Sequence, residues 1–338
     1  MKPKLDQNTC IFGASVLLKY LLAMHDEIDG VRSAEDIEAI HRMRVASRRL
    51  RNALPLFTDY LHTRKLTIWQ KQLQKTTRSL GAARDTDVQI EILKEFLNQI
   101  PSPEFKPGVR RLLLRWRQKR TKLQDNVNRS VDELVKAKTL DQIQQFLEPK
   151  AKQKEKDFVI TLDLFKLAYR SISSCLDEFL SYEEIIYQPE NIEELHMMRI
   201  TAKWLRYSME TFAPLYIDEL KEYTQVMREV QDVLGEIHDC DVWVQILPEF
   251  LQRENRRTIA YYGNASQMKQ LSAGVLYFQK TRQNERNRLY QVYVNEWANW
   301  KNADVWNRLR NLLQIPLMMT TDIYPPPPSS HQSSVDPT

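Results

Sequence analysis

The sequence predicts an all-α protein built from a duplicated unit. Glycine is scarce, with 7 residues among 338, which is about 2% of the chain where about 7% is typical. Such scarcity favours long helices joined by short loops. No stretch shows the alternation of apolar and polar residues that marks a half-buried strand. Two separate motifs also recur at nearly the same spacing, and a duplication leaves this kind of trace in a sequence.

The first repeated motif is a helix with a cationic face. At about 100° per residue, four of its side chains fall within roughly 80° of one another, namely His41, Arg44, Arg48 and Arg51, which we call the first stripe. Apolar residues point to the opposite side, namely Met43, Ala46, Leu50 and Leu54. The same steps recur 155 residues later in the second stripe, which consists of His196, Arg199, Lys203 and Arg206.

The second repeated motif is acidic. Leu80-Gly81 is followed by Asp85, Asp87 and Val88, and Leu234-Gly235 is followed 154 residues later by Asp239, Asp241 and Val242. Because both motifs keep nearly the same offset, the sequence indicates two similar halves of roughly 150 residues each.

The helices of the first half are expected in the following order. Residues 1–9 are expected to be flexible, and the first repeat to cover 10–148. A helix over about 10–29 is expected to end at Gly30. Ser33 with Asp36 resembles a capping box for the next helix, which should end near Pro55.

The remaining helices of this half are placed by their end signals. A helix over about 59–80 is expected to end at Leu80-Gly81. Asp85 is expected to cap a following helix that starts near Thr86 and ends before the prolines at 101–107. A fifth helix is expected over about 108–136, where arginine and lysine alternate with leucine.

The second half is expected to replay this order. Residues 149–156 are Lys-rich and are the expected joint, and the second repeat should cover 157–320. We expect an opening helix near 157–180, the helix with the second stripe after Pro189, and another helix that ends at Leu234-Gly235. A further helix is expected from Asp239, and a long last one near 268–300. Aligning Leu276 with Leu114 places Arg282 opposite Arg120. Residues 321–338 are rich in proline and serine and are expected to form a disordered tail.

Composition excludes several classes of protein. Neither GxxxxGK[ST] nor GxGxxG occurs, so a glycine loop that cradles a nucleotide is excluded. Cys10, Cys175 and Cys240 are too few and too scattered for a disulfide framework or a zinc site, which predicts reduced thiols in the cytoplasm. No apolar run reaches the roughly 18 residues of a membrane span, so no membrane partner is expected.

Both stripes indicate a site for a linear polyanion. A helix face without acids accepts like-charge repulsion, and ten residues of helix spread these cations over about 15 Å. The guanidinium of arginine can donate two parallel hydrogen bonds to phosphate oxygens, and the ammonium group of lysine attracts them as a point charge. The alternative is that the arginines pair with acids of neighbouring helices and only hold the helices together. His41 and His196 head the stripes, where each could donate to phosphate or instead be a buried histidine bound to a carbonyl or an acid.

With both stripes and both acidic motifs, the sequence from about residue 10 to 315 resembles the conserved-histidine α-helical domain (CHAD) family. The resemblance implies two antiparallel four-helix bundles related by a pseudo-twofold axis, with a basic channel between them. It also implies binding of inorganic polyphosphate, in some members at polyphosphate granules. One departure is His238, which stands where the first half has Arg84. The triphosphate-tunnel domain often fused to family members is not seen, so no catalytic activity is carried over.

The candidate polyphosphate-binding residues are the two stripes, two neighbours and several cations on other helices. They are His41, Arg44, Arg48, Arg49, Arg51, His196, Arg199, Lys203, Arg206, Tyr207, Lys119, Arg120, Arg282, Lys19 and Arg170. No cofactor is expected beyond a divalent cation that accompanies polyphosphate. Four tryptophans are expected in the core, namely Trp69, Trp116, Trp204 and Trp243.

Two other functions remain open. The pairs Asp85/Asp87 and Asp239/Asp241 could hold Mg²⁺ in a metal-dependent polyphosphatase or phosphotransferase. We favour a structural role, in which Asp85 and Asp239 cap helices while Asp87 and Asp241 pair with arginine, because the phosphatase motif follows a strand. Nucleic-acid binding is a third interpretation, although the stripes lack the interleaved aromatic residues that stack single-stranded bases. We therefore expect non-catalytic polyphosphate binding.

Overall fold

The protein is described by a computed structural model that covers residues 6–34, 36–61, 63, 65–152 and 158–319. The secondary structure of these residues is helical and contains no strand. The all-α prediction is therefore confirmed. Within the described residues, no helix is both long enough and apolar enough to cross a bilayer.

The helices are mostly long. In the first half they are α1 (Gln7–His25), α2 (Ile28–Ser33), α3 (Ile37–Leu56), α4 (Thr58–Leu61), α5 (Leu66–Gln99), α6 (Lys106–Lys136) and α7 (Thr139–Lys152). In the second half they are α9 (Leu162–Leu180), α10 (Ile192–Phe212), α11 (Lys221–Tyr262), α12 (Met268–Asn302) and α13 (Val305–Met319). Three short 3-10 helices are η1 (Pro103–Phe105), η2 (Glu183–Tyr187) and η3 (Ala213–Leu215).

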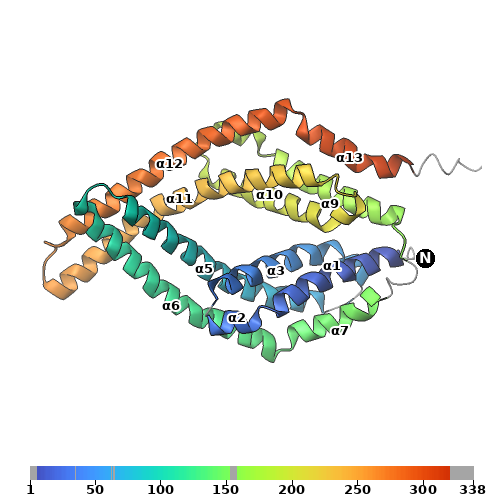
Figure 1. Cartoon of the computed structure of the whole chain (residues 1–338), viewed down its shortest axis with the longest axis horizontal. Helices are drawn as coiled ribbons and strands as arrows, with labels where there is room; N and C mark the ends of the chain where they lie inside the picture. The colour runs from blue at the N-terminus through green and yellow to red at the C-terminus, as the bar shows by residue number, and fades with distance from the viewer. Residues whose placement is uncertain (1–5, 35, 62, 64, 153–157, 320–338) are drawn as a thin grey trace, which may run out of the picture.

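The order in which helices pack is the same in both halves. In the first half α1 packs on α3 and α7, α3 on α5, and α5 on α6. In the second half α9 packs on α10 and α13, α10 on α11, and α11 on α12. Figure 1 shows these two sets of helices as two layers that diverge in the middle and meet at both ends.

Apolar cores join the two layers at both ends. At one end Phe12 of α1 stacks on Phe212 of α10, with ring centroids 6.1 Å apart, and Phe57 contacts the same ring. At the other end a separate core contains Trp116 of α6 and Trp243 of α11, whose ring centroids are 5.1 Å apart. Side chains of both halves therefore pack against each other at both ends of the molecule.

The backbones of the two layers approach each other closely where α6 crosses α12. A Cβ atom at Gly108 would overlap the carbonyl oxygen of Leu271, and one at Gly274 would overlap the carbonyl oxygen of Phe105. Only glycine permits this approach of two backbones. The two glycines lie 166 residues apart in the sequence. Their contact fixes the register between α6 and α12.

The acidic motif lies inside helices, which corrects the predicted helix ends. The helices expected over 59–80 and from Thr86 are one continuous helix, α5, and the corresponding pair in the second half is α11. Asp85 and Asp239 therefore do not cap helices. Glycine in a helix interior costs up to about 1 kcal/mol relative to alanine, so the two glycines need another explanation.

That explanation is the close passage of arginine side chains. A Cβ atom at Gly81 would lie 3.7 Å from Nε of Arg44, and one at Gly235 would lie 3.6 Å from Nε of Arg199. Each glycine thus leaves a place where an arginine of the neighbouring helix crosses α5 or α11. The Leu-Gly pairs were wrongly interpreted as helix ends because a glycine that accommodates a neighbour looks the same in sequence as a C-terminal cap.

Other predicted boundaries differ by small amounts. The helix α1 starts at Gln7, inside the segment expected to be flexible, because Asp6 accepts a hydrogen bond from the amide of Thr9 at 2.9 Å. Gly30 lies inside α2 and does not end α1. Asp36 caps α3 by accepting from the amide of Glu38. The final helix α13 was not predicted as a separate element.

Part of the predicted domain layout lies outside the described residues. This holds for residues 1–5, for 153–156 of the expected joint, and for the expected tail over 321–338. The first residues of the joint continue α7 to Lys152. Three of the predicted core tryptophans are buried, but Trp204 is 40% exposed, so its assignment to the core is wrong.

Candidate functional site

The two stripes lie on α3 of the first half and α10 of the second, and these two helices contact each other. Their apolar sides face the core, as the predicted helix periodicity requires, with Met43, Leu50 and Leu54 at most 1% exposed. Tyr207 lies between the stripes. The guanidinium carbon Cζ of Arg48 is 5.2 Å from the centroid of its ring, and that of Arg206 is 5.1 Å away.

The stripes end at a cavity of about 450 Å³ that residues of both halves line. Its polar lining comes in corresponding sets, first His41, Arg44, Arg84 and Asp85, then His196, Arg199, His238 and Asp239. We call this space the central cavity. Arg44 of the first stripe and Arg199 of the second therefore line the cavity, together with Asp85 and Asp239 of the acidic motifs.

Several buried polar atoms of the stripes have no hydrogen-bond partner among the described residues. They are Nδ1 of His41 and His196, Nε of Arg48 and Arg206, and the hydroxyl of Tyr207. A buried polar group without a partner costs about 1–3 kcal/mol. An anion with many oxygens could accept hydrogen bonds from a set of this kind, which is gathered from two helices.

The burial and the concentration of positive charge within the stripes lower the pKa of a lysine. Burial, followed by the charges of Arg48 and Arg199, lowers the pKa of Lys203 to about 8. Burial also lowers the pKa of Arg48, and both Arg206 and Arg199 of the other half add to that shift. The two stripes therefore repel each other across the interface, and an anion bound between them would remove this repulsion.

The histidines of the central cavity favour the neutral form. Burial lowers the pKa of His41 and of His196, and neighbouring arginines add to both shifts. The ring of His238 lies 4.1 Å from that of His196. Burial and the charge of His196 lower the pKa of His238 to about 4. On the opposite wall Arg84 pairs with Glu38 at 3.2 Å, so one wall carries a fixed charge where the other carries an imidazole.

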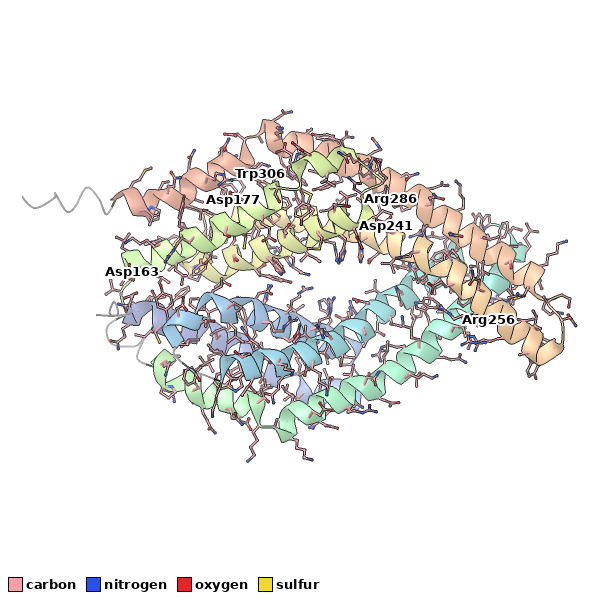
Figure 2. The ribbon with its side chains drawn as sticks, turned by 180° about the vertical axis from the view of Figure 1, so that it is seen from behind. Asp163, Asp177, Asp241, Arg256, Arg286 and Trp306 are labelled. Carbon is pink, nitrogen blue, oxygen red and sulfur yellow. The ribbon has the colours of Figure 1, made fainter. Side chains whose placement is uncertain are left out.

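Each of three motif acids contacts an arginine. Asp85 accepts from Arg44 of the first stripe at 3.2 Å. Asp87 accepts from Arg120 at 2.6 Å, and Asp241 accepts from Arg286 at 3.0 Å, as Figure 2 shows for α11 and α12. Arg120 and Arg286 lie outside the stripes, so these two acids orient α6 and α12 and do not contact the cationic faces.

The pairing corrects one predicted correspondence. Arg286, not Arg282, holds Asp241 in the way that Arg120 holds Asp87. The offset between Arg120 and Arg286 is 166 residues, the same as between the crossing glycines of α6 and α12. The alignment through Leu276 was one helical turn short. Arg282 instead lies over the ring of Phe278, with Cζ 5.5 Å from its centroid.

The remaining candidate residues do not line the central cavity. Arg49 pairs with Glu210 of α10 at 3.0 Å, and both line a second opening together with Lys19. Burial lowers the pKa of Arg51, and the charge of Arg78 adds to the shift. Lys119 lines a cleft between α6 and α11. Arg170 is exposed and donates to the carbonyl oxygen of Lys166, away from the residues that line the central cavity.

Sequence reasoning missed two contributors to this site. Arg84 was noted only as the counterpart of His238, although it lines the cavity directly. Glu210, which lies within 3.8 Å of Arg206 and also pairs with Arg49, was not considered. Its spacing of four residues from Arg206 is the signal that could have found it.

A comparison with models of known protein families identifies the family of this chain. The model of the CHAD domain matches residues 15–248, about two thirds of the chain and both stripes. The chain belongs to the CHAD domain family. The match begins within α1 and ends within α11, so it contains the central cavity.

Solved structures share the CHAD fold with this chain. The CHAD domain from the plant Ricinus communis superposes with a TM-score of 0.61 at 20% identity, over 86% of this chain and 93% of that one. PptA from Streptomyces chartreusis superposes with a TM-score of 0.54 at 12% identity, over 85% of this chain and 98% of that one. No curated protein matched the chain.

Proposed function

We propose that this CHAD domain binds inorganic polyphosphate between its two stripes and in the central cavity, and that it does not turn the polymer over. The observation that carries the proposal is the set of buried polar atoms on both stripes that have no partner among the described residues. Membership of the CHAD family supports polyphosphate as the anion. Association with polyphosphate granules would follow from binding.

The chemistry of the residues suits a chain of linked phosphates. Arg44 and Arg199 approach the central cavity from opposite walls, and each guanidinium offers parallel donors to two oxygens. Lys203 and Arg48 continue the cationic surface along α10 and α3. The imidazoles of His41 and His196 would donate hydrogen bonds and, beside a polyanion, take up a proton.

The acidic residues favour binding over catalysis. One carboxylate oxygen of Asp87 and one of Asp241 each accept a hydrogen bond from an arginine, with N–O distances of 2.6 and 3.0 Å. In the part of the chain that the structure describes, no three His, Cys, Asp or Glu side chains are grouped to hold a metal ion. A divalent cation would therefore arrive with the polyphosphate, held by phosphate oxygens more than by the protein.

The test compares two arginines of α3. Arg44 lines the central cavity, whereas Arg42 pairs with Glu27 and Asp36 on the outer side of the same helix. Arg44→Gln should weaken binding of long-chain polyphosphate by about tenfold or more, because a charge-assisted contact is worth about 1.5–3 kcal/mol. Arg42→Gln should leave the affinity unchanged. Equal affinities for both variants would place the site elsewhere.

A competition experiment separates polyphosphate from nucleic acid. At fixed salt, polyphosphate should displace labelled RNA, and RNA of equal charge should displace polyphosphate poorly, because the stripes offer no stacking platform for bases. Preferred binding of RNA would overturn the proposal. Release of phosphate that needs Mg²⁺ and stops with Asp87→Asn would replace it with the enzyme alternative.

A further inference from the structure

A second basic cleft lies between α6 and α11, outside the two stripes. It has a volume of about 440 Å³, and its charged lining is entirely cationic, namely Arg115, Lys119, Lys122, Arg253 and Arg257. These residues recur every three or four positions along each helix, so they form one face of α6 and one face of α11. The central cavity differs, because Asp85 and Asp239 stand there among the cations.

A buried acid holds two of the cations that line the α6–α11 cleft, Arg115 and Arg257, in place. Glu254 is 1% exposed. It accepts hydrogen bonds from Arg111 and Arg115 of α6 and from Arg257 of its own helix, at 2.6–3.2 Å. One carboxylate thus orients three guanidiniums and leaves them with a net positive charge. Preorganised donors of this kind bind an anion without the entropic cost of ordering long side chains.

The cleft adjoins the central cavity. Trp116 lines the cleft and Trp243 lines the cavity, and their ring centroids are 5.1 Å apart. The indole N–H of Trp116 donates to Gln89, which also lines the cavity, at 2.7 Å. Lys119 lies at the boundary. Its partial burial lowers its pKa, while Asp85 of the cavity opposes the shift and Arg253 of the cleft adds to it.

We propose that the α6–α11 cleft is a second subsite for the same polyanion, which a long polyphosphate chain reaches after filling the central cavity. The inference rests on the proposed function. The cleft adds about 10 Å of cationic surface along α6, from Arg115 to Lys122. Short chains would occupy the central cavity alone, so the two subsites together would make affinity depend on chain length. Figure 2 marks Arg256, the neighbour of Arg257, on α11 near α6, toward the far end of the molecule.

The experiment measures the affinity for two ligands, tripolyphosphate and a polyphosphate of several tens of units. Lys122 and Arg253 are exposed, so their charges can be reversed without disturbing the core. The double variant Lys122→Glu/Arg253→Glu should weaken long-chain binding by about tenfold or more, since several phosphate contacts are lost. It should leave the affinity for tripolyphosphate within about twofold of the original. Arg110→Glu/Arg117→Glu is the matched control with the same change of net charge, because both arginines are exposed on α6 but do not line the cleft.

Each other outcome has a separate meaning. Equal weakening for both ligands, or the same loss with Arg110→Glu/Arg117→Glu, would show a general charge effect and overturn the subsite. Unchanged long-chain affinity would overturn it as well. Loss of RNA binding with intact polyphosphate binding would assign the cleft to nucleic acid. If the unmodified protein binds neither polyphosphate, the proposed function itself fails, which is a different result from failure of the cleft alone.

Discussion

The guanidinium of Arg48 lies over the ring of Tyr207, with Cζ 5.2 Å from the ring centroid, and this contact joins α3 of one half to α10 of the other. The ring is 3% exposed, yet its hydroxyl has no partner among the described residues. A cation over a desolvated aromatic ring contributes about 1–2 kcal/mol. The ring therefore helps to hold two mutually repelling stripes together in the absence of an anion, while its hydroxyl is available to a ligand.

Tyr207→Phe separates these two roles. The variant keeps the ring and its contacts with Arg48 and Arg206 but removes the hydroxyl. We expect the free energy of unfolding in urea to change by less than about 1 kcal/mol, because no hydrogen bond within the protein is lost. The affinity for polyphosphate should fall by about tenfold or more, because a hydrogen bond to a charged group is worth about 1.5–3 kcal/mol. An unchanged affinity together with a stability loss would show that the hydroxyl has a partner within the protein.

Gly81 and Gly235 should tolerate alanine but not a branched side chain. An alanine Cβ would make ordinary contact with Arg44 or Arg199, and replacing glycine inside a helix should stabilise the protein by about 0.5–1 kcal/mol. The larger side chain of valine would displace Arg44 from its place against α5, or Arg199 from its place against α11. We expect Gly81→Val to weaken polyphosphate binding and Gly81→Ala to preserve it. Thermal unfolding and titration of both variants measure the two effects, and equal affinities would contradict this role for glycine.

These glycines also show where sequence reasoning stops. The stripes and the buried face of α3 were predictable, because a helix period depends only on spacing along the chain. Whether Leu-Gly ends a helix depends on what crosses the glycine, and here that is an arginine from a neighbouring helix. The correspondence of Arg120 with Arg286 likewise depends on where α6 and α12 cross. A contact that depends on packing between distant segments leaves no local signal.

Polyphosphate affinity should increase as pH falls. In the free protein His41, His196 and His238 are neutral at pH 7, because their pKa values are lowered, that of His238 to about 4. A bound polyanion favours the protonated forms, so binding takes up protons and strengthens as pH falls from 8 toward 5. Above pH 8 the affinity should decline further, because Lys203, with a pKa of about 8, loses its charge.

Calorimetric titration in buffers of different ionisation enthalpy measures this proton uptake. His238→Arg should bind more tightly at pH 8 and take up fewer protons, since it restores the fixed charge that Arg84 supplies on the other wall. A proton uptake of zero at pH 6–7 in the original protein would contradict contact between the histidines and the ligand.

The ligand-free protein should show the opposite trend with pH. Folding depresses the pKa of His238 from 6.5 to about 4. The unfolded chain therefore binds more protons between these values, and the free energy of unfolding decreases as pH falls through this window. Urea unfolding without polyphosphate at pH 7 and pH 5 tests the sign, and His238→Gln should reduce the difference. A stability that rises toward pH 5 in the original protein, but not in this variant, would contradict the assignment.

Asp87 should matter for stability and not for chemistry. Its side chain is 5% exposed and that of Arg120 is 16% exposed. Asp87→Asn would leave Arg120 with a largely buried and unpaired charge, which costs about 3 kcal/mol. Removing both charges, in Asp87→Asn with Arg120→Gln, should recover part of that loss. Urea unfolding measures both variants. A double variant less stable than the sum of the single variants predicts would contradict a simple ion pair.

The most direct test of the central claim is a calorimetric titration of the protein with long-chain polyphosphate at two salt concentrations, followed by an assay of free phosphate with and without Mg²⁺. Proteins that neutralise six to ten DNA phosphates lose about 10³-fold or more in affinity between 50 and 200 mM salt, and a similar loss is expected here. We predict tight binding at low salt, a steep decrease with salt, and no released phosphate. Weak binding that salt does not change, or phosphate released in the presence of Mg²⁺, would contradict the account.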